Sequence, residues 1–210
     1  MKKMFALSVV TLVACGGSNE AEVADEAAEL QRALANTVNQ AALPAIVAFE
    51  DEVVQMAADV TSFCAAPAEM GLSILQAQWR SLAESWNHAA LYSLGPLEQD
   101  PIFPLIDSVE SMRPNGTDYT DTVRETLDEA LASADTLDMA FFNALRFNEV
   151  GLLALEVLVF ESSVDGSTSL ANVLADYIAT PRKCEYLDGM AQRLVRTAQA
   201  AEAGWVTSFE

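Results

Sequence analysis

Apolar residues recur every three or four positions along most of this chain, and this spacing restricts the chain to helices. In the clearest case they fall on one face of a helix that ends before Pro67: Ile46, Phe49, Val53, Met56, Val60 and Phe63. A second stripe lies between residues 72 and 90, and no segment alternates with the period of two typical of a half-buried strand. Each helix then has one apolar face to bury, so the sequence predicts an all-α, up-and-down helical bundle.

A proline-rich connection interrupts the helical pattern between residues 97 and 119. The sequence predicts an irregular segment there, with one short helix near 106–112. The next helix is expected over about 121–141, with Asp121 or Thr122 as its N-terminal cap. Three further helices are predicted from the same spacing, at about 149–160, 170–178 and 182–208.

The N-terminus has the pattern of an export signal that ends at a cysteine. Two lysines precede an apolar run of about ten residues, which is too short for a bilayer because a transmembrane helix needs about 20. Residues 12–15 match a bacterial lipobox, in which the cysteine is acylated and the chain is cut before it. The alternative is an ordinary secretory signal with an unrelated cysteine. We expect a signal peptide over residues 1–14 and a lipid on Cys15, and Gly16 favours the outer membrane, facing the periplasm.

Residues 15–29 are small, polar and acidic, which predicts a flexible tether before a domain formed by residues 30–210. The chain has 31 acidic and 11 basic residues, a net charge of -20. A surface this acidic repels nucleic acid and anionic lipid headgroups. We therefore predict no nucleic-acid partner, and a membrane contact through the anchor at Cys15.

Beyond the anchor, two cysteines remain, Cys64 and Cys184. Disulfides persist in the compartments that receive exported proteins, so one bridge between the two is the simplest assignment. The alternative is two separate buried thiols. A bridge that closes so long a loop would stabilise the folded state by about 4–5 kcal/mol in the chain-entropy model.

Residues 150–160 are almost wholly apolar and carry a single charge, at Glu156. A helix that is apolar on all sides is buried, so Glu156 must reach an edge of the core or find a partner inside it. Burial without a partner raises the pKa of a carboxyl, and such carboxylates are candidates for catalysis or metal binding. The structural alternative is that Glu156 pairs with Arg80, Arg146 or a tryptophan indole N–H.

At this stretch the chain resembles the imelysin-like family, whose founding members were described as insulin-cleaving proteases and iron-regulated proteins of the cell envelope. The family signature is Gly-x-His-x-x-Glu on a helix, and the matching residues here are Gly151, Leu153 and Glu156. The sequence Gly-Leu-Leu-Ala-Leu-Glu is most similar to a lipoprotein branch of the family. Supporting resemblances occur in the same order at residues 63–67, Trp79 and Trp86, Gly95-Pro96, 182–187 and Trp205. They span about residues 43–205 and imply the first of two helical bundles found in full-length members.

The resemblance implies a metal site at the signature, where this chain has leucine in place of histidine. An imidazole three residues before a carboxylate lies on the same helix face and can share a cation with it, whereas Leu153 offers no lone pair. His88, the single histidine, would supply a ligand for iron or zinc only if it met Glu156 in the bundle. The simpler interpretation is a partly exposed row of Arg80, Glu84 and His88 on one helix.

The sequence thus predicts a non-enzymatic binding or accessory lipoprotein of iron or metal acquisition, with iron implied by the resemblance. A metallopeptidase is the first alternative, although a zinc peptidase helix carries two histidines that this chain cannot supply. No catalytic residue is assigned. The second alternative is a structural or interaction lipoprotein that has lost the site. The expected cofactor is at most a metal cation, and the expected partners are that cation or an envelope protein.

Overall fold

The computed structural model describes residues 20–92, 97, 105–110 and 117–209, and no residue in these ranges forms a strand. The predicted all-α class is confirmed. None of the helices in these ranges combines the length and apolar character that a membrane crossing requires. The chain divides into two units, Met1–Asn36 and Thr37–Glu210, and each is described by itself.

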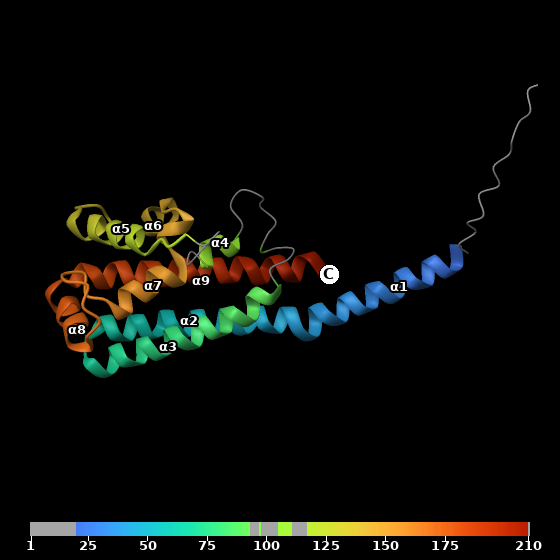
Figure 1. Ribbon diagram of the computed structural model, residues 1–210, viewed down its shortest axis with the longest axis horizontal. Coiled ribbons are helices and arrows are strands. Elements are labelled where there is room, and N and C mark those ends of the chain that lie inside the picture. Colours follow the sequence, from blue (N-terminus) through green and yellow to red (C-terminus); the bar gives the residue numbers. More distant parts are fainter. Residues whose placement is uncertain (1–19, 93–96, 98–104, 111–116, 210) are drawn as a thin grey trace, which may run out of the picture. The chain divides into compact units, whose positions relative to one another are not determined.

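The first unit contains most of helix α1 (Glu20–Thr37; Figure 1). Side chains from residue 25 onward in α1 are exposed, and these include Leu30 and Leu34. Residues 20–29, predicted as part of the tether, are helical, and the second unit begins at Thr37. Residues 1–14, Cys15 and the Gly95-Pro96 pair lie outside the described residues.

The core of the second unit is built around α2 (Leu43–Ala65), which follows a π-helical turn at Val38–Ala42. Helix α2 packs against α3 (Glu69–Ala89) and α9 (Pro181–Phe209), as Figure 1 shows. The predicted apolar stripe of α2 is buried along its whole length. This confirms the helical-bundle prediction, because the stripe supplies the contact surface for both neighbours.

The remaining helices complete the bundle around α9 and α3. They are α4 (Leu105–Val109), α5 (Thr120–Ala132), α6 (Met139–Ala144), α7 (Gly151–Phe160) and α8 (Leu170–Ala179), with short 3₁₀ turns at Ala90–Tyr92 and Phe147–Glu149. Helix α7 contacts α3, α5 and α9, so it is covered from several directions. Its apolar residues are buried on all sides, as its sequence predicts.

The prediction of one continuous helix over 121–141 is wrong. Helix α5 ends at Ala132, and α6 begins separately after Asp138. The Asp138 carboxylate caps α6 by accepting two backbone N–H groups of its first turn at 3.0 Å. The predicted cap at Asp121 or Thr122 is also wrong, because α5 starts at Thr120 and its N-cap residue is Tyr119, whose side chain makes no capping hydrogen bond.

The predicted disulfide is confirmed. Cys64 at the end of α2 is bonded to Cys184 at the start of α9, with the two Cα atoms 5.5 Å apart. The bridge closes a loop that includes α3 to α8, and it joins the C-terminal end of α2 to the N-terminal end of α9. In the chain-entropy model it reduces the freedom of the unfolded chain, which stabilises the folded state.

A buried ion pair lies next to the disulfide. Lys183 Nζ is 2.6 Å from Asp176 Oδ2, and both side chains are almost wholly buried. The ammonium also donates to the Glu161 carbonyl oxygen and lies over the Tyr177 ring. Burial lowers the pKa of Lys183. Burial alone would raise the pKa of Asp176, but hydrogen bonds from Lys183 and Ser163 bring this pKa below its usual value.

Replacing Lys183 with methionine should destabilise the protein by about 3–5 kcal/mol, because Asp176 then remains buried without its cation. Urea unfolding gives this free energy. The matched control is Arg196→Met, an exposed basic residue on the same helix, which should change stability by less than about 0.5 kcal/mol. Equal losses in the two variants would contradict a structural role for the ion pair.

A second polar contact joins α2 to α9 through two acidic residues. A side-chain hydrogen bond with Glu202, followed by burial and repulsion from the same group, raises the pKa of Glu50 from 4.5 to about 7. The folded state therefore holds a proton more tightly at Glu50 than the unfolded chain does. This contribution to stability is fully present below pH 4.5 and is lost as the pH rises to about 7.

Glu50→Gln should remove this part of the pH dependence. Between about pH 5 and pH 8 the melting temperature of the wild type should fall more than that of the variant, because only the wild type loses the shared proton. Thermal melts at several pH values measure the difference. Glu84→Gln, which removes an exposed carboxylate on α3, should keep the wild-type profile, and the prediction fails if Glu50→Gln keeps it too.

Candidate functional site

The site begins at Gly151, where the backbone enters α7 with φ of 79°. A Cβ atom built at this glycine would lie 2.5 Å from the Val109 carbonyl oxygen and 2.7 Å from that of Ser108. Both the positive φ and the close approach of α4 therefore require glycine here. Gly151, the first residue of the signature, thus fixes the direction in which α7 leaves the preceding loop and the direction that its first two turns face.

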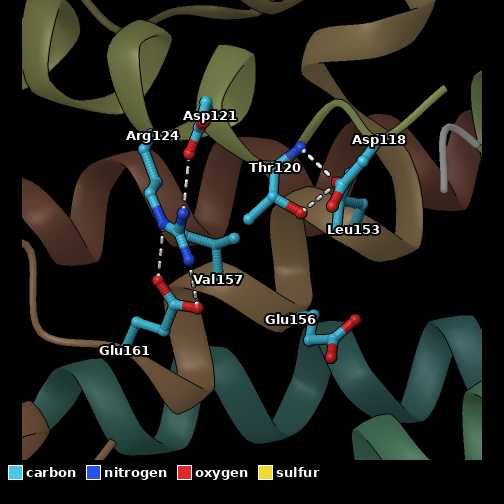
Figure 2. Close-up of a pocket in the computed structure, with 8 residues that line it drawn as sticks. All are labelled: Asp118, Thr120, Asp121, Arg124, Leu153, Glu156, Val157 and Glu161. Carbon is cyan, nitrogen blue, oxygen red and sulfur yellow. Dashed lines mark hydrogen bonds and ion pairs between the residues drawn. The ribbon is translucent and has the colours of Figure 1, made fainter. Parts of the chain in front are cut away.

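Leu153 and Glu156 line the same pocket of about 410 Å³ (Figure 2). The other lining residues come from α7, α5 and the segment before α5: Asp118, Thr120, Asp121, Arg124, Val157 and Glu161. Leu153 is 6% exposed, while Glu156 is half-buried at the edge of the core. Glu156 thus lies at an edge of the core, which is one of the two positions that the sequence left open.

Arg124 connects the two helices that form the pocket. Its guanidinium donates two hydrogen bonds to the Glu161 carboxylate, each 2.9 Å long, and a third to Asp121 at 2.8 Å (Figure 2). The hydrogen bond to Glu161 is the main reason that the pKa of Arg124 rises above its usual value. The bidentate pair holds α5 beside the end of α7, so it sets the width of the pocket.

Asp118 brings a further carboxylate to the pocket. Its Oδ1 atom accepts hydrogen bonds from the Thr120 backbone N–H at 2.9 Å and from the Thr120 hydroxyl at 2.6 Å. This turn directly precedes α5, and Figure 2 shows Asp118 beside Leu153. The pocket is thus lined by four carboxylates and one guanidinium, an arrangement that attracts cations.

The partners that the sequence suggested for Glu156 make other contacts. The Trp79 indole N–H donates to the Leu152 carbonyl oxygen at 2.9 Å. The Arg80 guanidinium lies 4.9 Å from the centre of the Phe160 ring. Arg146 lines a different pocket.

His88 is exposed on α3 and is not a lining residue of the Glu156 pocket. Glu84, one turn earlier, is exposed as well, which matches the simpler interpretation of a solvated row on that helix. Within the described ranges no three side chains of His, Cys, Asp and Glu gather closely enough to hold a metal ion.

Comparison with known proteins shows to which family the chain belongs. The family model described as imelysin matches residues 42–209. The chain belongs to the imelysin family. No curated protein and no solved structure was found to match it. The match covers almost the whole second unit of this imelysin and confirms the resemblance inferred from its sequence.

The residues of this imelysin do not fit a tightly bound transition metal. Zinc sites in proteins use three or four protein ligands, and the signature here supplies the carboxylate of Glu156 without an imidazole. Leu153 faces the pocket from the position that the signature gives to histidine. The pocket therefore keeps its acidic character but lacks a nitrogen ligand from the signature.

Gly151→Ala should destabilise this imelysin much more than Gly166→Ala. Both glycines have positive φ, but a Cβ at Gly166 meets nothing within 4 Å, whereas one at Gly151 meets a backbone carbonyl at 2.5 Å. Gly166→Ala should cost about 1–2 kcal/mol from the left-handed conformation alone. Urea unfolding of both variants checks this, and equal losses would show that the approach of α4 does not constrain Gly151.

Proposed function

We propose that this imelysin is a non-enzymatic lipoprotein of the cell envelope, anchored through Cys15, that serves iron or metal acquisition as a binding or accessory component. The observation that carries the proposal is the lining of the Glu156 pocket. This lining combines the signature carboxylate of Glu156 with Leu153, which stands at the position of the signature histidine. It therefore favours a binding function over catalysis.

A peptidase mechanism has little support from these residues. A metal-dependent peptidase activates water on a cation held by about three protein ligands. The single histidine of the chain is exposed on α3, outside the lining of the Glu156 pocket. A binding role needs no such ligand set.

The acidic lining of the pocket supports weak cation binding. Asp118, Asp121, Glu156 and Glu161 face a volume of about 410 Å³ together with Arg124. A volume of this size admits a cation that keeps part of its water shell, because the carboxylates then act through their charge rather than as a complete first shell. The net charge of -20 raises the local cation concentration around the whole molecule.

Calorimetric titration with Fe²⁺ and Zn²⁺ tests the binding proposal. Glu156→Gln should abolish the weak heat signal of cation binding. It removes the charge of the signature carboxylate, while the side chain keeps about the same size. Leu153→His should raise the affinity at least tenfold, about 1.4 kcal/mol, because the imidazole and Glu156 then share one helix face. Glu84→Gln, exposed on α3, is the control and should bind like the wild type.

Other results of these experiments would support one of the alternative functions. If the wild type takes up no metal and Leu153→His gains none, the metal role is wrong and the structural or interaction lipoprotein remains. Cleavage of an unstructured protein that stops with a chelator would favour the metallopeptidase.

A further inference from the structure

A second pocket, of about 360 Å³, has the opposite electrostatic character. It is lined by Ser108, Ala144, Leu145, Arg146, Phe147 and Arg193. None of these residues lines the pocket at Glu156. Two arginines thus meet at one pocket in a chain that has 31 acidic and only 11 basic residues.

Arg193 reaches the pocket from α9 and is half-buried. Its Nη1 atom donates to the carbonyl oxygens of Phe142 and Leu145 at the end of α6. Among the described residues its Nε and Nη2 atoms donate no hydrogen bond, and it forms no ion pair within 4.0 Å. Burial lowers the pKa of Arg193, and the charge of Glu149 acts in the opposite direction. Capping α6 therefore uses one nitrogen of the guanidinium, and a guanidinium has further N–H donors on its other two nitrogens.

Arg146 approaches the same pocket from the start of the turn at Phe147–Glu149, and it is exposed. The Glu149 carboxylate accepts a hydrogen bond from the Arg146 backbone N–H at 2.6 Å. This contact fixes the turn but does not neutralise the side chain, which forms no ion pair within the described ranges. Within the described ranges, neither guanidinium group at the pocket has a carboxylate within 4.0 Å.

Apart from Ser108, the other side chains that line the pocket are apolar. Leu145, Phe147 and Ala144 contribute hydrocarbon surface, and the Phe147 ring is held edge-to-face by Tyr119 with ring centres 5.8 Å apart. A bare inorganic anion would use the arginines alone. A ligand that combines a carboxylate with an apolar group would use both kinds of wall.

We propose that this pocket binds a small organic carboxylate. Arg146 and Arg193 hold its two oxygens, and its apolar part packs on Leu145 and Phe147. A carboxylate in this pocket can accept charge-assisted hydrogen bonds from both guanidinium groups. The site is independent of the proposed cation binding at Glu156, and either can fail without the other.

Titration of the full mature chain with phenylacetate, followed by calorimetry and by the NMR signals of the arginine side chains, tests the proposal. We expect saturable binding with shifts at Arg146 and Arg193. Phenylacetamide, which has the same shape but no charge, should bind at least tenfold more weakly, and inorganic phosphate should also bind more weakly. Equal binding of phenylacetamide would overturn the role of the arginines, and tighter binding of phosphate would overturn the organic class.

Arg146→Gln is the variant of choice, because Arg146 is exposed and its backbone contact to Glu149 remains. It should weaken phenylacetate binding at least tenfold. The matched control is Arg196→Gln, which removes an exposed arginine of α9 outside the pocket and should bind like the wild type. No saturable binding below about 10 mM, or equal effects of the two substitutions, would overturn the proposal.

Discussion

The burial of α7 on all its sides is the constraint on which the rest of the second unit depends. A helix with no polar face needs neighbours in every direction, and α3, α5 and α9 supply them. The single charge of α7, Glu156, then has one class of position left, at an edge of the core, because an unpaired carboxylate inside the core would be too costly. The pocket at Glu156 is therefore a consequence of core packing. Arg124 and Glu161 close it from the side of α5.

Features that depend on local periodicity and on residue type could be predicted from the sequence. The apolar stripe of α2, the buried α7 and the Cys64–Cys184 bridge are all confirmed. The break between α5 and α6 could not be found in this way, because the apolar spacing continues across it. The sequence does contain the residue that caps α6, because Asp138 precedes Ala140 by two positions and its carboxylate accepts the Ala140 backbone N–H.

The candidate site was also predicted only in part, because local sequence patterns do not reveal which distant residues pair with each other. Glu156 and Leu153 were found because both lie on one apolar helix. Asp118 and Thr120 form a local turn that an Asp-x-Thr pattern suggests. Arg124 and Glu161 are 37 positions apart, and nothing in their local sequence distinguishes this pair from other exposed charges. The buried pair of Lys183 and Asp176 was missed for a similar reason, since its members belong to different helices and charged residues are rarely fully buried.

The exchange of histidine for leucine at position 153 has a physical consequence beyond the lost ligand. This side chain is 6% exposed, so an imidazole there would be largely desolvated and its pKa would fall, which keeps it neutral and ready to bind a cation. A leucine at the same place instead buries its whole side chain and stabilises the folded state by about 1.5–3 kcal/mol. Residues at functional sites are commonly less favourable for stability than apolar ones would be. The pocket of this imelysin therefore combines a buried leucine with an acidic rim, so the cation binding that we propose relies on the charge of the rim.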